Sequence, residues 1–126
     1  MKLGILNTSI ATENGNYGLY ALSLEQAQEI FNLALTKDGF DSAVGHQGAA
    51  DVLSVLLGFK IPLNRQQFAQ QQNQAAIVLK LKGRLPEGTV LNSIEEIEAV
   101  GYELKLLVRI PDCYGQPVKL MGLFAL

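Results

Sequence analysis

The chain is short of the residues that define several protein classes. Among its 126 residues are one cysteine, one histidine and no tryptophan. The single cysteine, Cys113, cannot form a disulfide within the chain, which argues against a small secreted domain held together by disulfides. Because the one histidine and the one cysteine lie far apart in the sequence, they form no cluster with metal-ligand spacing. We therefore expect no bound metal and no other cofactor.

Long apolar runs and a strong charge of one sign are also lacking. The run "AAIVLKLKG" is interrupted by lysine after five residues, whereas a helix that crosses a bilayer needs about twenty. No basic and apolar leader of the signal-peptide type precedes the first apolar run. Ten basic and twelve acidic residues give a formal net charge of -2, so the chain has no polycation to hold a long nucleic acid. We expect a cytoplasmic protein that binds neither a membrane nor long nucleic acid.

Hydrophobic residues make up 48 % of the chain, enough for one core in a single domain spanning residues 1–126. Three stretches carry helix signals. Ser23 with Gln26 three residues later is a capping-box pattern before the first helix, and Ser93 precedes a short helix in "IEEIEAV". Between them, an apolar run after His46 stops at Gly58, the type of residue that ends helices.

The strands are predicted from apolar runs and from alternation. They are the first run in "MKLGILNTS", residues 40–44, the edge-like "FKIPLNR" at 59–65, "AAIVLKLKG" at 75–83 and the alternating "YELKLLVRI" at 102–110. The apolar tail after 110 can supply another. The stretch "ATENGNYG" is expected to be a loop, and the glutamine tract "QQFAQQQNQ" a turn or an extended hairpin. The fold class is α/β or α+β, with a mixed sheet of about five strands flanked by three helices.

The only histidine lies in "SAVGHQG", residues 42–48, directly before the second helix. Gly45 and Gly48 on either side let the backbone approach a ligand closely or take a positive φ, and the free N–H groups of the helix start attract anions. A histidine side chain titrates near neutral pH and can protonate a leaving oxygen. The pattern therefore predicts an anion site with an acid beside it. A histidine that only caps or packs explains the same pattern, because one residue does not define a site.

Arginines at two turns offer further candidates. Arg65 ends the stretch "IPLNR", and Arg84 is followed by Glu87 in "GRLPEG". The planar guanidinium fork matches phosphate oxygens, and Glu87 can orient the fork or accept a hydroxyl proton. Taken alone, an arginine and a glutamate in a turn are better explained as a surface ion pair of little energetic value.

Four blocks in a fixed order carry a resemblance to a known family. They are "ILNTSI", "SAVGHQGAADVLSVLLG", "IPLNR" and "LKLKGRLPEGTVL". Across roughly residues 1–109 the chain resembles the small archaeal-virus and phage proteins that were long classed as a domain of unknown function and were later recognised as type III anti-CRISPR ring nucleases. The resemblance implies metal-independent cleavage of cyclic tetra-adenylate in the cytoplasm of the host cell. It also implies that the ring sits between the subunits of a homodimer and that a ribose 2'-hydroxyl attacks the adjacent phosphate.

The resemblance also implies residue roles. His46 would be the general acid on the leaving 5'-oxygen, Arg84 would stabilise the transition state and Glu87 would orient the site. Arg65 would hold the ligand. The other substrate-binding residues implied are Asn7, Thr8, Ser9, Gly45, Gln47, Gly48 and Lys80.

The sequence departs from the family pattern at two of these positions. Gly48 stands where many relatives have serine, which removes one hydroxyl contact to the scissile phosphate. Lys80 stands where some viral members have glutamine, and it can add charge or face solvent. Two alternatives therefore stay open, namely a protein that sequesters a cyclic oligonucleotide without cutting it and a structural or interaction protein.

Overall fold

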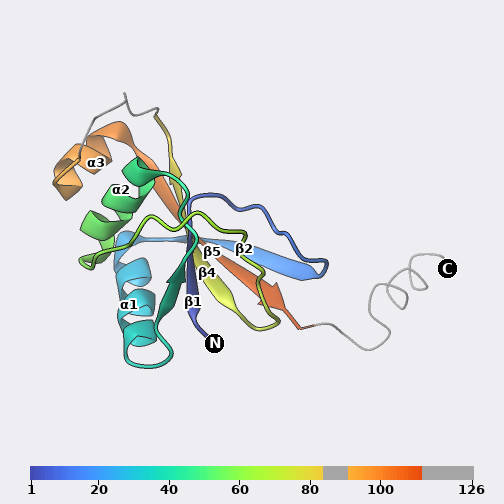
Figure 1. Cartoon of the computed structure of the whole chain (residues 1–126). Helices are drawn as coiled ribbons and strands as arrows, with labels where there is room; N and C mark the ends of the chain where they lie inside the picture. The colour runs from blue at the N-terminus through green and yellow to red at the C-terminus, as the bar shows by residue number, and fades with distance from the viewer. Residues whose placement is uncertain (84–90, 112–126) are drawn as a thin grey trace.

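The computed structural model describes residues 1–83 and 91–111, in which three helices pack against one mixed sheet (Figure 1). The strands are β1 (Leu3–Leu6), β2 (Asn16–Leu22), β3 (Phe40–Ser42), β4 (Ala75–Leu81) and β5 (Tyr102–Ile110). The helices are α1 (Leu24–Leu35), α2 (Gln47–Leu57) and α3 (Ile94–Val100). The predicted fold class, with five strands and three helices, is confirmed.

The sheet order is β2-β5-β4-β1-β3. Strand β1 pairs in parallel with β3 and with β4, whereas β5 pairs antiparallel with β4 and with β2. Strands β1, β3 and β4 therefore run in one direction, and their carboxyl ends meet at the same edge of the sheet.

The helix boundaries follow the predicted caps. The Gln26 N–H donates to Ser23 Oγ at 3.1 Å and the Ser23 N–H donates to Gln26 Oε1 at 2.9 Å, which completes the capping box of α1. Helix α2 ends at Gly58, whose φ of 68° lies in the left-handed region that favours glycine. The Ser93 hydroxyl accepts the N–H of Glu96 at 3.2 Å at the start of α3. The positions of all three helices could thus be predicted from the sequence.

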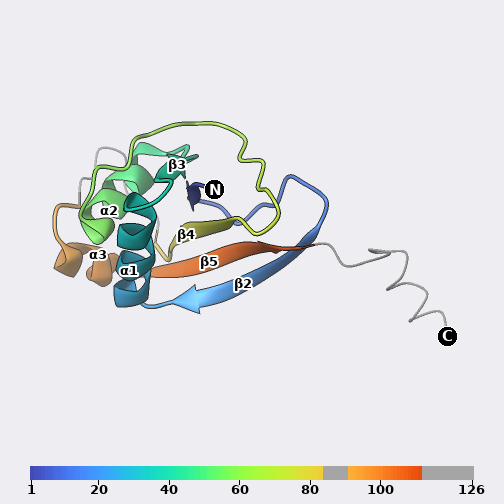
Figure 2. The same cartoon turned by 90° about the horizontal axis from the view of Figure 1, so that it is seen from below.

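One face of the sheet packs against the helices and forms the main core. Phe31 of α1 is fully buried there, and its ring centroid lies 5.2 Å from that of Phe40 and 5.7 Å from that of Phe59. Buried residues of β1, β4 and β5 complete this core, namely Leu3, Ile5, Ile77, Leu79 and Leu104. Figure 2 shows that the three helices gather at one end of the sheet, while β2 and β5 extend away from them.

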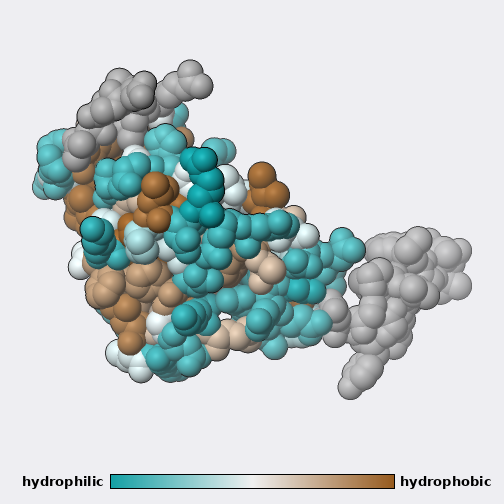
Figure 3. Space-filling view, viewed as in Figure 1, coloured by the Kyte–Doolittle hydropathy of each residue, from teal (hydrophilic) through white to brown (hydrophobic). Residues whose placement is uncertain are grey.

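The opposite face, which we call the open face, is covered in part by the connection from α2 to β4, residues 58–74. The first part of this connection still packs into the main core through Phe59 and Ile61, and only the part around Phe68 lies on the open face. Phe68 of this connection packs on a second apolar cluster that includes Leu6 and Ala76. Gly4 leaves room for its ring, since a Cβ at Gly4 would lie 2.5 Å from the Phe68 ring. In Figure 3, hydrophilic residues cover most of the middle of the surface, over this connection, and apolar residues gather over the helices.

The strand predicted at residues 59–65 is wrong, because these residues form no strand. Their polar groups bond elsewhere: the Ile61 N–H donates to Ser54 Oγ at 2.8 Å, and the Asn64 N–H donates to the Val44 carbonyl at 2.9 Å. The glutamine tract that follows is not a hairpin, but it ends in the turn that was the other expectation, in which the Gln74 N–H donates to the Gln71 carbonyl at 3.0 Å. Its buried Gln70 donates from Nε2 to the carbonyls of Gln74 and Leu107, at 2.6 and 2.9 Å. Scattered hydrogen bonds to side chains and to single main-chain carbonyls thus replace a strand ladder in this part of the chain.

The fifth strand is β2, which was not predicted from the sequence. The expected loop at residues 11–18 is wrong in its second half, because β2 begins at Asn16 and pairs with β5 over seven residues, from Asn16 opposite Ile110 to Leu22 opposite Leu104. It is an edge strand whose Leu19 and Tyr20 are 46 % and 55 % exposed. None of its residues is fully buried, so neither face requires a regular series of apolar side chains. The sequence of β2 therefore lacks the alternation of apolar and polar residues that predicts a strand.

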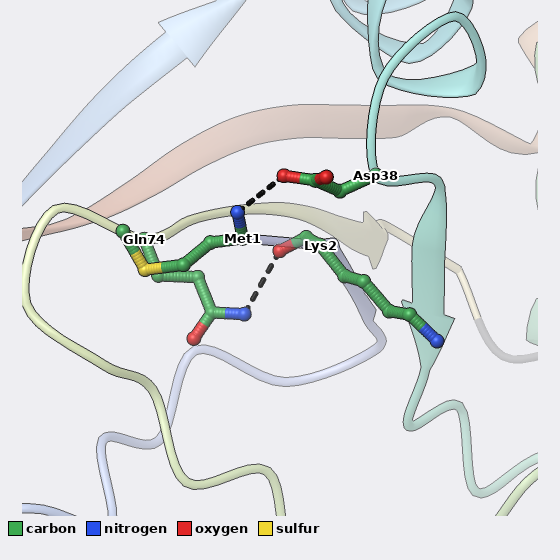
Figure 4. A network of polar contacts seen from close by, with 4 residues as sticks. All are labelled: Met1, Lys2, Asp38 and Gln74. Atoms are coloured by element: carbon green, nitrogen blue, oxygen red, sulfur yellow. Dashed lines mark hydrogen bonds and ion pairs between the residues drawn. The ribbon is translucent and has the colours of Figure 1, made fainter.

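The amino end of β1 is tied to two neighbouring segments (Figure 4). The Met1 amino group pairs with the Asp38 carboxylate, which follows α1, and Gln74 Nε2 donates to the Lys2 carbonyl at 2.8 Å. The hydrogen bond and the positive charge of the amino group lower the pKa of the Asp38 carboxyl. These contacts fix where β1 enters the sheet, between β3 and β4. Within residues 1–83 and 91–111, no helix has the length and apolarity needed to span a membrane.

Candidate functional site

A pocket of about 310 Å³ lies where β1 and β4 end. Its lining residues are Asn7, Thr8, Ser9, Ile10, Val78, Leu79, Lys80 and Lys105. Residues 7–10 directly follow β1, and Lys80 is the last but one residue of β4. Ligands of open α/β sheets bind at the carboxyl ends of the parallel strands. The structure therefore brings together four of the predicted substrate-binding residues, Asn7, Thr8, Ser9 and Lys80, in the position expected for a ligand site.

Asn7 joins this pocket to the histidine loop, residues 43–46. The Gly45 N–H donates to Asn7 Oδ1 at 3.2 Å. The bond crosses from the end of β1 to the loop that follows β3, which are neighbours because β1 and β3 pair in parallel. The pocket and the histidine loop are thus neighbours at the carboxyl edge of the sheet.

His46 is the N-cap residue of α2, as the sequence predicted. Its backbone is extended, with φ -135° and ψ 127°, and its carbonyl accepts the Ala50 N–H at 3.0 Å. The side chain is exposed and makes no capping hydrogen bond. The imidazole therefore neither caps α2 nor packs in the core, and it is accessible to a ligand.

Arg65 holds the histidine loop from the other side. Its Nε and Nη2 donate to the Gly45 carbonyl at 3.2 and 2.9 Å. Gly45 consequently accepts from Arg65 and donates to Asn7, so two predicted site residues fix the backbone directly before His46. The predicted role of Arg65 as a ligand-holding residue is not tested by these contacts, which are to the main chain.

Gln47 and Gly48 occupy the first turn of α2. The exposed Gln47 side chain donates to Asp51 Oδ1 at 2.8 Å, along the same helix face. Neither Gly45 nor Gly48 has a positive φ, so these glycines are not required by a left-handed backbone. The predicted catalytic residues Arg84 and Glu87 lie outside the described residues, as does the apolar tail after 111.

One charged residue of the pocket, Lys105, was not predicted as a site residue from the sequence. The alternating pattern of residues 102–110 correctly placed Lys105 on the same side of its strand as Glu103 and Arg109. The pattern did not show that this side lies beside Asn7 and Lys80. The missing information is the register, which puts Lys105 opposite Val78. Among the described residues, no group of three His, Cys, Asp or Glu side chains is arranged to hold a metal ion.

Comparison with known proteins identifies the family. The family model described as STIV B116-like matches residues 3–104. The chain belongs to the STIV B116-like family. Its similarity to a solved member, B116 of Sulfolobus turreted icosahedral virus, has a TM-score of 0.75 at 20 % identity and covers 86 % of this chain and all of that one. At this identity the likeness shows the fold.

Relatives in this STIV B116-like family come from viruses and from a bacterium. The uncharacterized protein ORF117 of Acidianus two-tailed virus is 37 % identical over 111 residues, which cover 86 % of this chain and 93 % of the relative. The uncharacterized protein YddF of Bacillus subtilis is 31 % identical over 111 residues, covering 87 % and 99 % of the two chains. The similarity thus extends over nearly the whole of these relatives.

Proposed function

We propose that this STIV B116-like protein is a metal-independent ring nuclease that cleaves cyclic tetra-adenylate, the signal made by type III CRISPR effector complexes. The observation that carries the proposal is the hydrogen bond between Gly45 and Asn7. It connects the pocket that contains Lys80 to the loop that presents an exposed histidine. Such a surface offers donors for phosphate oxygens beside a group able to give a proton.

The chemistry needs little from the protein, because the nucleophile belongs to the substrate. The ribose 2'-oxygen forms a bond to the adjacent phosphorus and loses its proton to solvent, while the bond from phosphorus to the 5'-oxygen breaks. His46 gives its proton to that leaving oxygen, and the product ends in a 2',3'-cyclic phosphate. Arg84 and Glu87 are proposed to stabilise and orient the transition state, as the family resemblance implies. Alignment of the attacking oxygen and charge stabilisation supply the rest of the rate enhancement.

The ring is proposed to bind between two copies of the chain. A two-fold dimer presents each group twice, which suits a ring with repeated phosphates and allows a chain of net charge -2 to bind a polyanion. The relatives from archaeal viruses and from a bacterium are compatible with either an anti-CRISPR role or a cellular off-switch for the same signal.

The test is incubation of the full chain with cyclic tetra-adenylate in EDTA, with products identified by mass spectrometry. Linear oligoadenylates are expected from the wild type. His46→Ala should lower the single-turnover rate by about a hundred- to ten-thousand-fold, the usual contribution of a general acid. His46→Gln is the matched variant, because it keeps a polar side chain that can contact the ring but cannot serve as the acid. Ring binding by His46→Gln should be close to that of the wild type.

A cleavage rate that does not respond to the His46 substitutions would overturn the proposed acid.

The favoured alternative is a protein that binds the ring without cutting it, and the glycine at position 48 is the feature that motivates it. Gly48 lies in the first turn of α2, where the family pattern often has a serine hydroxyl. Ring that is retained but uncut would support sequestration. In that case Gly48→Ser should create or raise cleavage. If the protein does not retain the ring at all, the remaining alternative is a structural or interaction protein.

A further inference from the structure

Lys105 lies in the pocket although neither the sequence pattern nor the family resemblance pointed to it. It occupies the middle of β5, opposite Val78 of β4 and opposite Ala21 of β2. Its side chain is 33 % exposed, and it lines the pocket together with Lys80.

The sheet register places the two lysines on one face. Val78 and Lys80 are two residues apart on β4, so their side chains share a face, and the same holds for Glu103 and Lys105 on β5. Since Val78 lies opposite Lys105 and Lys80 opposite Glu103, all four side chains project from the open face. Lys80 and Lys105 are diagonal neighbours, about 7–8 Å apart at the backbone, which is within reach of one anion for two long side chains.

The charge around this pair is positive. Glu103 Oε2 lies 3.9 Å from Lys105 Nζ, and Glu103 Oε1 lies 3.9 Å from Lys82 Nζ. Ion pairs of this length between partly exposed side chains contribute little and exchange readily with other partners. Among the described residues that line the pocket, Lys80 and Lys105 are positively charged and none is acidic, in a chain whose formal net charge is -2. The positive charge of the described pocket is therefore local, as a small anionic ligand requires.

We propose that Lys105, together with Lys80, binds a phosphate group of the ring; this inference rests on the ring-nuclease proposal above. The amide and hydroxyls of residues 7–9 provide neutral donors on the other wall of the pocket, and Ile10 with Val78 provides apolar surface for a ribose or a base. Glu103 holds the Lys105 ammonium when no ligand is bound, and the phosphate replaces it on binding. Lys105 is a binding residue in this scheme and takes no part in proton transfer.

The experiment measures equilibrium binding of cyclic tetra-adenylate at several salt concentrations, in a His46→Gln background so that the ring is not consumed. Lys105→Met should weaken binding by about tenfold or more, the usual cost of removing one charge-assisted hydrogen bond. The slope of log affinity against log salt concentration should also become less negative, by about 0.7 for each phosphate that no longer pairs with a lysine. Lys105→Arg retains the charge and should bind nearly as tightly as the parent protein.

Lys82→Met is the matched control. Lys82 lies at the same 3.9 Å from Glu103 as Lys105 but is absent from the pocket lining, so its removal should change the affinity by less than about twofold. Thermal unfolding of each variant shows that it is folded. Equal affinities for Lys105→Met and Lys82→Met would overturn this inference and leave the ring-nuclease proposal intact. Failure of the wild type to bind the ring would overturn the ring-nuclease proposal itself.

Discussion

At the scale of single residues, Asn7 contributes in two ways that substitutions can separate. Its side-chain oxygen accepts the Gly45 N–H, and its side chain lines the pocket with Lys80. Asn7→Ala leaves the part-buried Gly45 N–H without this acceptor and should lower the free energy of unfolding by about 1–2 kcal/mol. Urea denaturation measures this decrease.

Asn7→Asp is the matched variant for Asn7→Ala. The carboxylate keeps an acceptor for the Gly45 N–H, so the protein should be nearly as stable as the wild type. The added negative charge faces the same pocket as Lys80, so ring binding should be weaker than in Asn7→Ala. Equal binding by the two variants would show that the Asn7 side chain does not face the ligand.

His46 shows what a single residue reveals before its surroundings are known. A glycine-flanked histidine before an apolar run predicted a helix start, and the N-cap position is confirmed. The sequence left open whether the imidazole caps, packs or faces a ligand. The structure decides against the first two, because the side chain is exposed and makes no capping bond. The position of the imidazole depends on Arg65 and Asn7, two residues far from His46 in the sequence whose side chains fix Gly45 by hydrogen bonds.

At the scale of elements, the connection over the open face depends on the contact of Gly4 with Phe68. A Cβ at Gly4 would lie 2.5 Å from the ring and 3.0 Å from Ala76 Cβ, so Gly4→Ala should lower the free energy of unfolding by about 1–3 kcal/mol, as overpacking usually does. Phe68→Leu in the same chain should recover part of this stability, because the shorter side chain leaves room. A double-mutant cycle in urea measures the coupling. Strictly additive effects would contradict it.

Elements with strong local signals could be predicted, and those decided by partners could not. Helix α1 has its capping box and a buried apolar face, so both its start and its type follow from local sequence. Residues 59–65 have the composition of a strand, but Pro62 cannot donate to a ladder and Asn64 bonds to the Val44 carbonyl instead. Strand β2 has a weak local pattern and exists because β5 supplies a partner along its whole length.

At the scale of the whole molecule, the ring proposal requires two copies of the chain. Strand β2 is the edge of the sheet and carries exposed Leu19 and Tyr20, features that favour pairing with another chain. Sedimentation equilibrium at micromolar concentration should give the mass of two chains of 13.7 kDa. Added cyclic tetra-adenylate should raise the dimer fraction, because a ligand stabilises the state that binds it. A ring-bound monomer would contradict a ligand site shared between subunits.

The sequence by itself determined the helices with their caps, the α/β class, and the candidate residues at the end of β1 and before α2, whereas Lys80 was a candidate only through the family resemblance. These follow from local chemistry, since capping, periodicity and glycine stops act over a few residues. The tertiary structure alone decided that Asn7, Gly45 and Arg65 form one hydrogen-bonded group and that Lys105 joins Lys80 in the pocket. These contacts depend on a sheet order that pairs strands far apart in the chain, and no local pattern encodes which strands become neighbours.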